Sequence, residues 1–389
     1  MTTTRRSLTN AKVERIPASG IRRFFDLVSG VEGVISLGVG EPDFVTPERF
    51  REAAIRSIKE GKTKYTSNYG IRPLRDAISA HTQKLRGVRY DPEREILVTV
   101  GVSEAVDLAL RATLNDGDEV IIADPSYVAY VPGIVLAGGV AVPVPTEEKH
   151  DFRLRPEDVE AAITPRTRAI LLGFPNNPTG AVLTEDDLRG LARLAEQHDL
   201  LIFADEIYDR LVYGGRHHSI IELPGMRERT VYLAGFSKSY AMTGWRVGYA
   251  CAPAEVIEQM MKIHQYTVMC VPTAGQYAAL DALLTGENEV LRMVAEYDQR
   301  RKVMFKRFND LGLHCFEPRG AFYCFPNITS TGMDDEQFAE RLLREEKVVT
   351  VPGSAFGERG RGHVRACYAA SLEKIEEACD RIARFVGRA

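Results

Sequence analysis

The sequence predicts an α/β fold with a mainly parallel sheet, together with a smaller α+β domain. In the middle of the chain, short β-rich runs alternate with helix-prone stretches of ten or more residues, which is typical of βαβ crossovers. The chain has 389 residues. A single core stops growing at about 250–300 residues, so two domains are expected.

Seven short runs are predicted as the strands of the main sheet. They are residues 95–100, 119–123, 140–144, 168–172, 200–204, 230–234 and 247–250. Most of these runs are apolar throughout, as expected for strands that helices cover on both faces. Prolines in the run 140–144 indicate an edge strand. Apolar residues at helical spacing predict helices over 103–114 and 185–198, between neighbouring strands.

The pattern changes after Pro272. Residues 287–311 form one long, charged stretch with a high helix propensity, which we expect to lead into the smaller domain. Further elements are predicted as strands over 321–325, 348–351 and 363–367, a helix over 336–346, and a final helix from Glu373. The predicted division is a large domain over 48–285, with 1–47 and 286–389 forming the small domain and an N-terminal segment.

Composition indicates an ordinary globular protein. Net charge is −4, from 50 basic and 54 acidic residues, and the apolar share is 44%. This balance gives no electrostatic reason to expect nucleic acid or an anionic membrane as a partner. The most apolar stretch, 130–145, is interrupted by prolines and glycines and is too short to span a bilayer. Residues 1–10 lack the apolar core of a secretory signal, so a cytoplasmic protein is expected.

The cysteine and histidine patterns do not predict a metal site. None of the six cysteines forms a C-x-x-C pair, and buried thiols in a reducing compartment are the expected state. His217 and His218 are adjacent, but no third ligand follows at zinc-site spacing, so a loop turn is expected there.

Polar groups follow the carboxyl ends of four predicted strands, where ligands bind in open α/β sheets. Each group suits one part of an anionic, aromatic aldehyde. Gly101 permits a tight turn, and the backbone N–H groups of Val102 and Ser103 would bind a phosphate at a helix N-terminus. Arg246 can bind the same phosphate through its planar guanidinium. Lys238 can form a Schiff base with an aldehyde.

The remaining groups suit an aromatic ring. Asp205, when ionised, favours a protonated ring nitrogen, which turns the ring into an electron sink. Asn177 and Tyr208 can donate hydrogen bonds to a phenolate oxygen, and Tyr127 offers a face for stacking. Each residue alone has an ordinary explanation: Lys238 as a surface charge, the tyrosines as core residues. Only their occurrence at the ends of successive strands predicts a site.

Six motifs resemble those of one enzyme family. They are LGVGEPDF at 37–44, NNPTG at 176–180, ADEIY at 204–208, SKSYAMTGWRVGY at 237–249, GAFY at 320–323 and VRACY at 364–368. In this order they resemble class I/II aminotransferases, a branch of the fold-type I enzymes that use pyridoxal 5'-phosphate (PLP). The resemblance spans about residues 15–385 and is closest to archaeal and bacterial aromatic-amino-acid and aspartate aminotransferases.

The resemblance implies a role for each matching residue. Lys238 would form the Schiff base and shuttle protons, Asp205 would pair with the ring nitrogen, and Asn177 and Tyr208 would bind the ring hydroxyl. Tyr127 would stack on the ring. The remaining cofactor role, binding of the phosphate, would fall to Val102, Ser103, Ser237 and Arg246.

Substrate and partner roles are implied in the same way. Arg365 would bind the substrate α-carboxylate, assisted by Gly40 and Asn177, although a structural ion pair is the ordinary role of an arginine in a strand. Tyr65 would reach the phosphate of a neighbouring subunit, which implies a homodimer with shared sites. The reaction implied is amino transfer from an L-amino acid to a 2-oxo acid such as 2-oxoglutarate.

One position bears on substrate choice. Some aspartate aminotransferases of the family carry a lysine beside the phosphate-binding turn that binds the substrate's side-chain carboxylate, and the matching position here is Ser103. Aromatic or broad specificity is therefore favoured, and aspartate or alanine aminotransferase is the alternative. A neighbouring subunit could supply further walls of the pocket from residues 266–273.

Three other functions remain to be weighed. A PLP-dependent β-lyase would use the same lysine and aspartate. A PLP-binding regulatory module would carry a DNA-binding helix-turn-helix, and none precedes the enzyme-like region. A nicotinamide oxidoreductase would need G-x-G-x-x-G between a strand and a helix, which no predicted strand provides.

Overall fold

The computed structural model describes residues 8–14, 16 and 32–388. The seven predicted strands form one sheet in the order β2-β8-β7-β6-β5-β3-β4. Their bounds are Ile96–Thr99 (β2), Glu119–Asp124 (β3), Val140–Pro145 (β4), Thr167–Gly173 (β5), Leu201–Asp205 (β6), Thr230–Gly235 (β7) and Gly248–Cys251 (β8). Strand β8 runs opposite to the other six strands, which are parallel to one another, so the predicted mainly parallel α/β sheet is confirmed.

Strand β4 lies at one edge of this sheet, as its prolines predict. It pairs only with β3, and Pro143 and Pro145 lack the N–H that a second partner strand would need. Most of its side chains are exposed or half-buried, whereas every residue of β3 is buried. The polarity of a strand therefore follows its place in the sheet.

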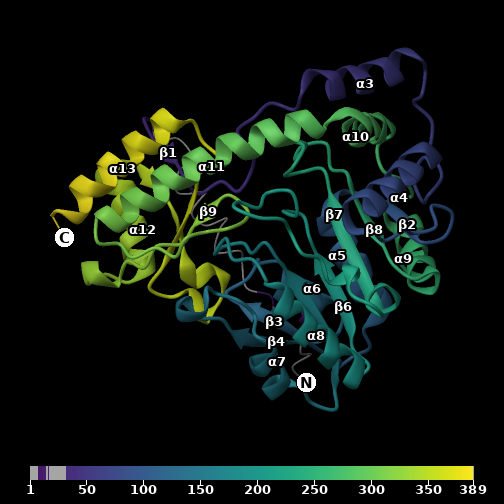
Figure 1. Ribbon diagram of the computed structural model, residues 1–389, viewed down its shortest axis with the longest axis horizontal. Helices are drawn as coiled ribbons and strands as arrows, with labels where there is room; N and C mark the ends of the chain where they lie inside the picture. Colours follow the sequence, from purple (N-terminus) through teal and green to yellow (C-terminus); the bar gives the residue numbers. More distant parts are fainter. Residues whose placement is uncertain (1–7, 15, 17–31, 389) are drawn as a thin grey trace, which may run out of the picture.

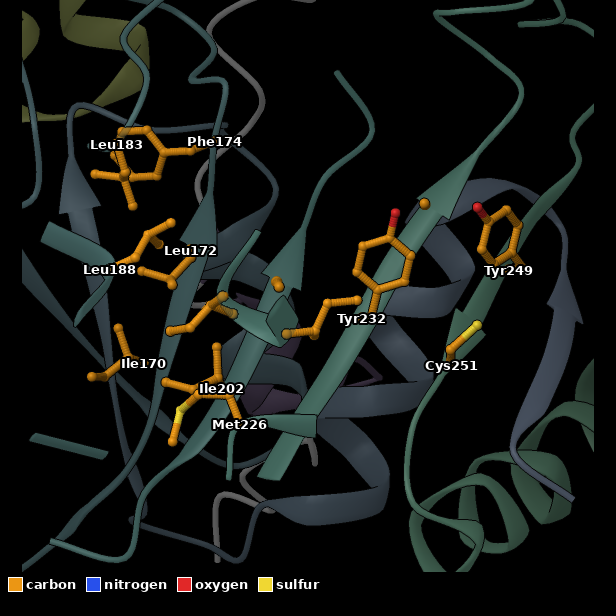
Figure 2. Close-up of a cluster of buried hydrophobic side chains, with 14 of the residues drawn as sticks. Ile170, Leu172, Phe174, Leu183, Leu188, Ile202, Met226, Tyr232, Tyr249 and Cys251 are labelled. Carbon is orange, nitrogen blue, oxygen red and sulfur yellow. The ribbon is translucent and has the colours of Figure 1, made fainter. Parts of the chain in front are cut away.

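Helices cover both faces of the sheet, because successive side chains of each strand point in opposite directions. In β5, Ile170 and Leu172 belong to one buried cluster, shown in Figure 2, while Leu171 belongs to another on the opposite face. The cluster of Figure 2 includes residues of α3 (Glu48–Lys59), α4 (Arg72–Arg86), α7 (Pro156–Ala162), α8 (Glu185–Gln197) and α10 (Thr273–Thr285). The opposite cluster includes residues of α5 (Gly101–Thr113), α6 (Tyr130–Leu136) and α9 (Ala254–Thr267). We call this sheet with its helices the large-sheet region.

A second group of elements packs around a small antiparallel sheet, on the left of Figure 1. It contains β9 (Tyr323–Cys324), β11 (Val351–Pro352), β12 (Val364–Cys367), α11 (Glu287–Asp310), α12 (Asp335–Glu346) and α13 (Leu372–Val386). Strand β1 (Ile35–Ser36) joins it by pairing with β10 (Val348–Val349). We call these elements the small-sheet region. The described N-terminal residues also include α1 (Ala11–Glu14).

Short 3-10 helices complete the described elements. They are Glu148–His150, Ile220–Glu222, Arg227–Arg229, Thr329–Thr331, Gly353–Phe356 and Glu358–Gly360. The last two lie in the small-sheet region, between β11 and β12.

Two strand predictions in the small-sheet region are wrong in detail. The run 348–351 is two strands, because the chain changes partner at Thr350, from β1 to β12. The predicted strand 321–325 is reduced to β9, since Ala321 adopts a left-handed backbone with φ of 57°. Neither change of backbone direction alters the apolar pattern, so the sequence pattern does not reveal it.

Long helix α11 connects the two regions, as Figure 1 shows. Val290 belongs to a buried cluster of the large-sheet region, while Met293 and Tyr297, on the same helix, belong to the cluster of the small-sheet region. Because one helix contributes to both clusters, the domain boundaries at residues 47/48 and 285/286 stay a prediction.

Two further features bear on the sequence predictions. All six cysteines are free thiols, and five are buried, whereas Cys270 is only half-buried. Within the described residues, no helix combines the length and the apolar character that crossing a membrane requires.

Candidate active site

One cavity of about 440 Å³ opens at the carboxyl ends of β5, β6 and β7, beside the N-terminus of α5. Eleven of the twelve predicted site residues line it, and they come from both regions of the molecule. They are Gly40, Val102, Ser103, Tyr127, Asn177, Asp205, Tyr208, Ser237, Lys238, Arg246 and Arg365. The twelfth, Tyr65, does not line the cavity of its own chain. The fold therefore gathers these residues at one place, while their individual roles stay predictions.

Lys238 lies three residues beyond the end of β7. Its Nζ donates a hydrogen bond of 2.5 Å to the carbonyl oxygen of Gly40. Burial lowers the pKa of Lys238 to about 8, because a charged amine loses its hydration in the cavity. A substantial share of this amine is therefore neutral near pH 8, the form that attacks an aldehyde or accepts a proton.

Asp205, the last residue of β6, is the buried carboxylate of the cavity. Its Oδ2 accepts a hydrogen bond of 2.8 Å from the hydroxyl of Tyr130, and its Oδ1 accepts one of 3.2 Å from the backbone N–H of Ile207. Burial raises the pKa of Asp205 to about 6, and the Tyr130 hydrogen bond opposes that rise. A cationic partner in the cavity would favour the ionised form.

Tyr130 has no role in the sequence prediction. It begins α6 inside the most apolar stretch of the chain, where a buried tyrosine is expected to serve only as packing. A Cβ at residue 173 would collide with the hydroxyl of Tyr130, so Gly173 makes room for the contact with Asp205. The signal for its role would have been a glycine at the end of the neighbouring strand β5.

The first turn of α5 forms a cradle suited to an anion. Gly101 has a φ of 71°, and a Cβ at this position would lie 2.6 Å from Nη2 of Arg246. The guanidinium therefore lies directly against the turn that presents the first backbone N–H groups of the helix. Its Nη1 donates to the carbonyl oxygen of Thr243 at 3.0 Å. A helix N-terminus with an adjacent guanidinium fits a phosphate group.

Arg365, on β12, lines the same cavity from the small-sheet region. The side chain is 2% exposed. Its Nη1 donates to Oδ1 of Asn177 and its Nη2 to the carbonyl oxygen of Gly38, both at 2.7 Å. Within the described residues, the hydrogen bonds of Arg365 go to an amide and a backbone carbonyl and not to a carboxylate, so the ordinary role of a structural ion pair receives no support. A buried, unpaired guanidinium in a cavity is suited to bind an anionic ligand.

Aromatic side chains form much of the remaining wall. Tyr127 makes an edge-to-face contact with Tyr130, with ring centroids 5.5 Å apart. The hydroxyls of Tyr208 and Tyr323 form a buried hydrogen bond of 2.8 Å. Tyr323 belongs to a motif noted in the sequence, but no role is predicted for it. No sequence pattern indicates a role for Tyr323, because its contact with Arg365 arises only when the chain folds.

Tyr65 lies on the surface, with 81% of the residue exposed. The neighbouring Lys64 carbonyl accepts a hydrogen bond of 3.1 Å from the hydroxyl of Thr273, so this loop adjoins the segment 266–273. In that segment Tyr266 is 88% exposed and Met269 is 44% exposed. Two adjoining segments of the large-sheet region therefore carry exposed large side chains.

His217 makes a structural contact. Its Nε2 lies 2.7 Å from Oε2 of Glu206. The other carboxylate oxygen of Glu206, Oε1, accepts a hydrogen bond from the hydroxyl of Ser219. Over the residues that the structure describes, no group of three or more His, Cys, Asp or Glu side chains is arranged to hold a metal ion.

Comparisons with known proteins identify the family. Residues 32–382 match the family model described as aminotransferase class I and II. The chain is 46% identical over 378 residues to aromatic-amino-acid aminotransferase 2 of Thermococcus litoralis, covering 96% of this chain and 97% of that protein. It is 44% identical, again over 378 residues, to aspartate aminotransferase of Pyrococcus abyssi, with the same coverage of 96% and 97%.

The fold agrees with these sequence matches. The structure of aspartate aminotransferase from Thermus thermophilus with maleate matches at a TM-score of 0.93 and 39% identity, covering 98% of this chain and 100% of that one. The large parallel sheet and the small antiparallel sheet are those of fold-type I aminotransferases. The chain therefore belongs to the class I and II aminotransferases, PLP-dependent enzymes that transfer amino groups between amino acids and 2-oxo acids.

Proposed function

We propose that this enzyme takes its amino group from aromatic or a broad range of L-amino acids and passes it to a 2-oxo acid such as 2-oxoglutarate. The observation that carries the proposal is the pairing, in one cavity, of a buried Lys238 amine with a buried, unpaired Arg365 guanidinium. The first group suits covalent attachment of an aldehyde, and the second suits the carboxylate that every α-amino acid carries.

The residues of the cavity fit PLP. Arg246, Ser103, Ser237 and the backbone of Val102 would hold the phosphate at the N-terminus of α5. The ring would contact the groups of the neighbouring strand ends, namely Asp205, Asn177, Tyr208 and Tyr127. When bound, PLP supplies an aldehyde that captures amines and a ring that accepts electrons from the bond being broken.

The protein's own groups would divide the remaining work. Lys238, freed when the substrate amine takes its place, would accept the α-proton and return it to another carbon. Asp205, in its ionised form, would keep the ring nitrogen protonated. Arg365 would fix the substrate carboxylate and so orient the α-carbon toward Lys238.

The donor class is inferred from the charges of the cavity wall. Among the described residues that line the cavity, the cations are Lys238, Arg246 and Arg365, and each has a role above. No further lining cation is available for a side-chain carboxylate, and the exposed Ser103 cannot replace one. The tyrosines of the wall provide apolar surface and ring edges for an aromatic side chain. Aspartate and alanine are the alternative donors.

A visible absorption spectrum of the purified protein tests this proposal. The protein is saturated with PLP and titrated with single amino acids in the absence of any 2-oxo acid. Aromatic amino acids are expected to remove the yellow colour at lower concentrations than aspartate or alanine. Lys238→Ala is expected to lose the covalent linkage, while Lys302→Ala, at an exposed lysine of α11, should retain it. Stronger conversion by aspartate or alanine would contradict the proposed donor class, and covalent PLP in Lys238→Ala would contradict the site.

We further propose a homodimer in which Tyr65 completes the site of the second subunit. The exposure of Tyr65, Tyr266 and Met269, in two segments joined by the hydrogen bond between Thr273 and Lys64, supports this, since exposed large side chains in adjoining segments are typical of an interface. Tyr65 does not line the cavity of its own chain, as a residue that acts across an interface would not.

Subunit mixing tests the shared site. Lys238→Ala and Tyr65→Ala are each expected to be strongly impaired, and sedimentation should show both as dimers. After unfolding and refolding together, half of the dimers would be mixed, and one of the two sites in each would be intact. The mixture should therefore recover about a quarter of the wild-type activity. If Tyr65 acts within its own chain, mixing should restore no activity.

We also propose a division of the chain into two domains. The large domain would comprise residues 48–285, with 1–47 and 286–389 forming the smaller domain and the N-terminal segment. The cytoplasmic location likewise stays a prediction.

A further inference from the structure

Tyr323 contacts several groups of the site, although neither the sequence motifs nor the proposed roles assign it a function. It lies on β9, is 1% exposed, and lines the cavity. Its hydroxyl lies 2.8 Å from the hydroxyl of Tyr208, and either oxygen could donate. It is therefore the direct partner of the phenol proposed to bind the ring hydroxyl of PLP.

The ring of Tyr323 also supports the proposed substrate-binding arginine. The Cζ atom of Arg365 lies 4.4 Å from the centroid of Tyr323 and 4.8 Å from the centroid of Phe356. Two aromatic rings thus contact one guanidinium, whose Nη atoms are held by hydrogen bonds to Asn177 and Gly38. Arg365 Nε has no hydrogen-bond partner, so the two rings are the remaining described contacts of the guanidinium.

A third contact brings Tyr323 close to Lys238. A Cβ at Gly40 would lie 2.5 Å from the hydroxyl oxygen of Tyr323, so only a glycine leaves room for this hydroxyl. The carbonyl oxygen of the same Gly40 accepts the hydrogen bond from Lys238 Nζ. One side chain therefore touches Tyr208, Arg365 and the backbone that positions the lysine.

We propose that Tyr323 is a positioning residue that links the two ends of the active site: its hydroxyl orients the hydroxyl of Tyr208 toward the cofactor, and its ring orients Arg365 toward the substrate carboxylate. This inference rests on the proposed function. The hydroxyl and the ring have separate effects, so different substitutions can remove them one at a time.

The direction of the hydroxyl hydrogen bond follows from proton counting. Burial raises the pKa of both tyrosines well above the ordinary value, so both phenols stay protonated at neutral pH. A hydroxyl has one proton and two lone pairs. If Tyr208 donates its proton to the phenolate oxygen of PLP, its own oxygen is free to accept, and Tyr323 donates to it. Such a chain strengthens the donor at its end.

Two substitutions at Tyr323 separate the effects, and one elsewhere serves as a control. Tyr323→Phe removes only the hydroxyl, whereas Tyr323→Leu also removes the ring against Arg365. Tyr213→Phe is a matched control, because Tyr213 is a buried tyrosine of the same cluster but outside the cavity. Its hydroxyl donates to the carbonyl oxygen of Ala321 at 2.6 Å, and its ring lies 5.2 Å from Cζ of Arg301.

The first readout is the pH at which the visible absorption of the PLP-loaded enzyme changes, which reports the proton on the nitrogen that joins Lys238 to the cofactor. Without Tyr323 as a donor, Tyr208 neutralises the phenolate oxygen less effectively, and that oxygen holds the neighbouring proton more tightly. Tyr323→Phe should therefore raise the midpoint by about 0.5–1 pH unit. Tyr213→Phe should leave it unchanged.

The second readout is the KM for the amino-acid donor. Tyr323→Leu should raise this KM by about 3–30-fold through the loss of the ring contact, while Tyr323→Phe should change it much less.

The inference is overturned if the midpoint of Tyr323→Phe equals that of the wild type, or if Tyr213→Phe shifts as much. A KM of Tyr323→Leu that equals that of Tyr323→Phe would overturn the role of the ring. If Tyr323→Leu does not fold, Tyr323→Phe and its control still decide the role of the hydroxyl. Failure of the proposed function is distinguishable: a wrong donor class would show as stronger conversion of the wild type by aspartate or alanine with the midpoint shift of Tyr323→Phe unaffected, and a wrong site would show as a wild type without a Lys238-dependent visible band.

Discussion

The two sides of the cavity are built in different ways. In the large-sheet region, Asp205 ends β6 and Lys238 follows the end of the neighbouring parallel strand β7, so one sheet brings the two residues to the same edge. On the other side, Arg365 and Tyr323 come from the small sheet, and packing brings Arg365 against Gly38 and Tyr323 against Gly40 of the N-terminal segment. Groups fixed by one sheet suit the cofactor and the chemistry, whereas groups that depend on packing between regions suit the binding of a substrate that must enter and leave.

The largest expected effect concerns the large-sheet side. Asp205→Asn removes the buried charge but keeps the size of the side chain, so the ring nitrogen loses its anionic partner. We expect kcat to fall by about 100–1,000-fold, the usual loss for one preorganised electrostatic group, with little change in KM. Steady-state kinetics with a saturating 2-oxo acid measure both constants. Asp199→Asn, at a carboxylate whose side chain is 92% exposed, serves as the control.

A smaller effect of the opposite kind is expected on the small-sheet side. Arg365→Lys keeps a positive charge but loses the planar, two-pronged hydrogen bonding that suits a carboxylate. KM for the amino acid should rise by about 10–100-fold, with a weaker effect on kcat. Arg361→Lys, at an exposed arginine before β12, should behave like the wild type. If Asp205→Asn acted mainly on KM and Arg365→Lys mainly on kcat, the assignment of cofactor chemistry to the large-sheet side and of substrate binding to the small-sheet side would be wrong.

Loss of the contact that joins the two sides of the cavity should raise the KM for the amino acid by less than Arg365→Lys does. Asp124 lies at the end of β3. The backbone N–H of Arg359 donates to both of its carboxylate oxygens, each at 3.3 Å. It lies against Gly357, where a Cβ would collide with the carboxylate. The backbone N–H of Ser126 also donates to the carbonyl oxygen of Phe356, the residue that packs on Arg365. The large-sheet region thus holds the loop that supports the arginine.

Asp124→Ala should therefore raise KM for the amino acid by about 3–10-fold and leave kcat nearly unchanged, because the loop loses a buried acceptor. Asp124→Asn, which retains a carbonyl oxygen as acceptor, should show a smaller rise. The measurement is the same donor titration used for Arg365→Lys. Equal KM values for Asp124→Ala and the wild type would show that the loop is held without this carboxylate.

The same contrast explains which features could be predicted from the sequence. The gathering of Asp205, Asn177 and Lys238 at one place could be predicted from the sequence. Polar residues after apolar runs mark the carboxyl ends of parallel strands, and one sheet brings those ends together. The contacts of Tyr130 with Asp205 and of Tyr323 with Tyr208 could not be predicted, since each depends on which side chain packs opposite it in three dimensions. The division of the run 348–351 also escaped prediction, because a change of partner strand leaves no mark on the apolar pattern.

The smallest expected effect is a pH dependence that tests whether Asp205 is held ready for a cationic partner. Burial raises the pKa of Asp205 from 3.8 to about 6 in the protein without cofactor. Between these two pH values the folded chain binds more protons than the unfolded chain. The contribution of Asp205 to the free energy of unfolding is therefore fully present below about pH 4 and is lost as pH rises through about 6. Asn at this position does not titrate.

The measurement is the melting temperature of the cofactor-free wild type minus that of cofactor-free Asp205→Asn, from pH 4 to pH 7. Titration of the other carboxylates largely cancels in this difference. It should fall by about 3 °C, the size expected for a pKa shift of two units in a chain of this length. With PLP bound, the protonated ring nitrogen favours the ionised carboxylate, so the decline should weaken or reverse. A decline of equal size with and without PLP would mean that Asp205 does not face the cofactor. The proposal that the large-sheet side binds the cofactor ring through Asp205 would then be wrong.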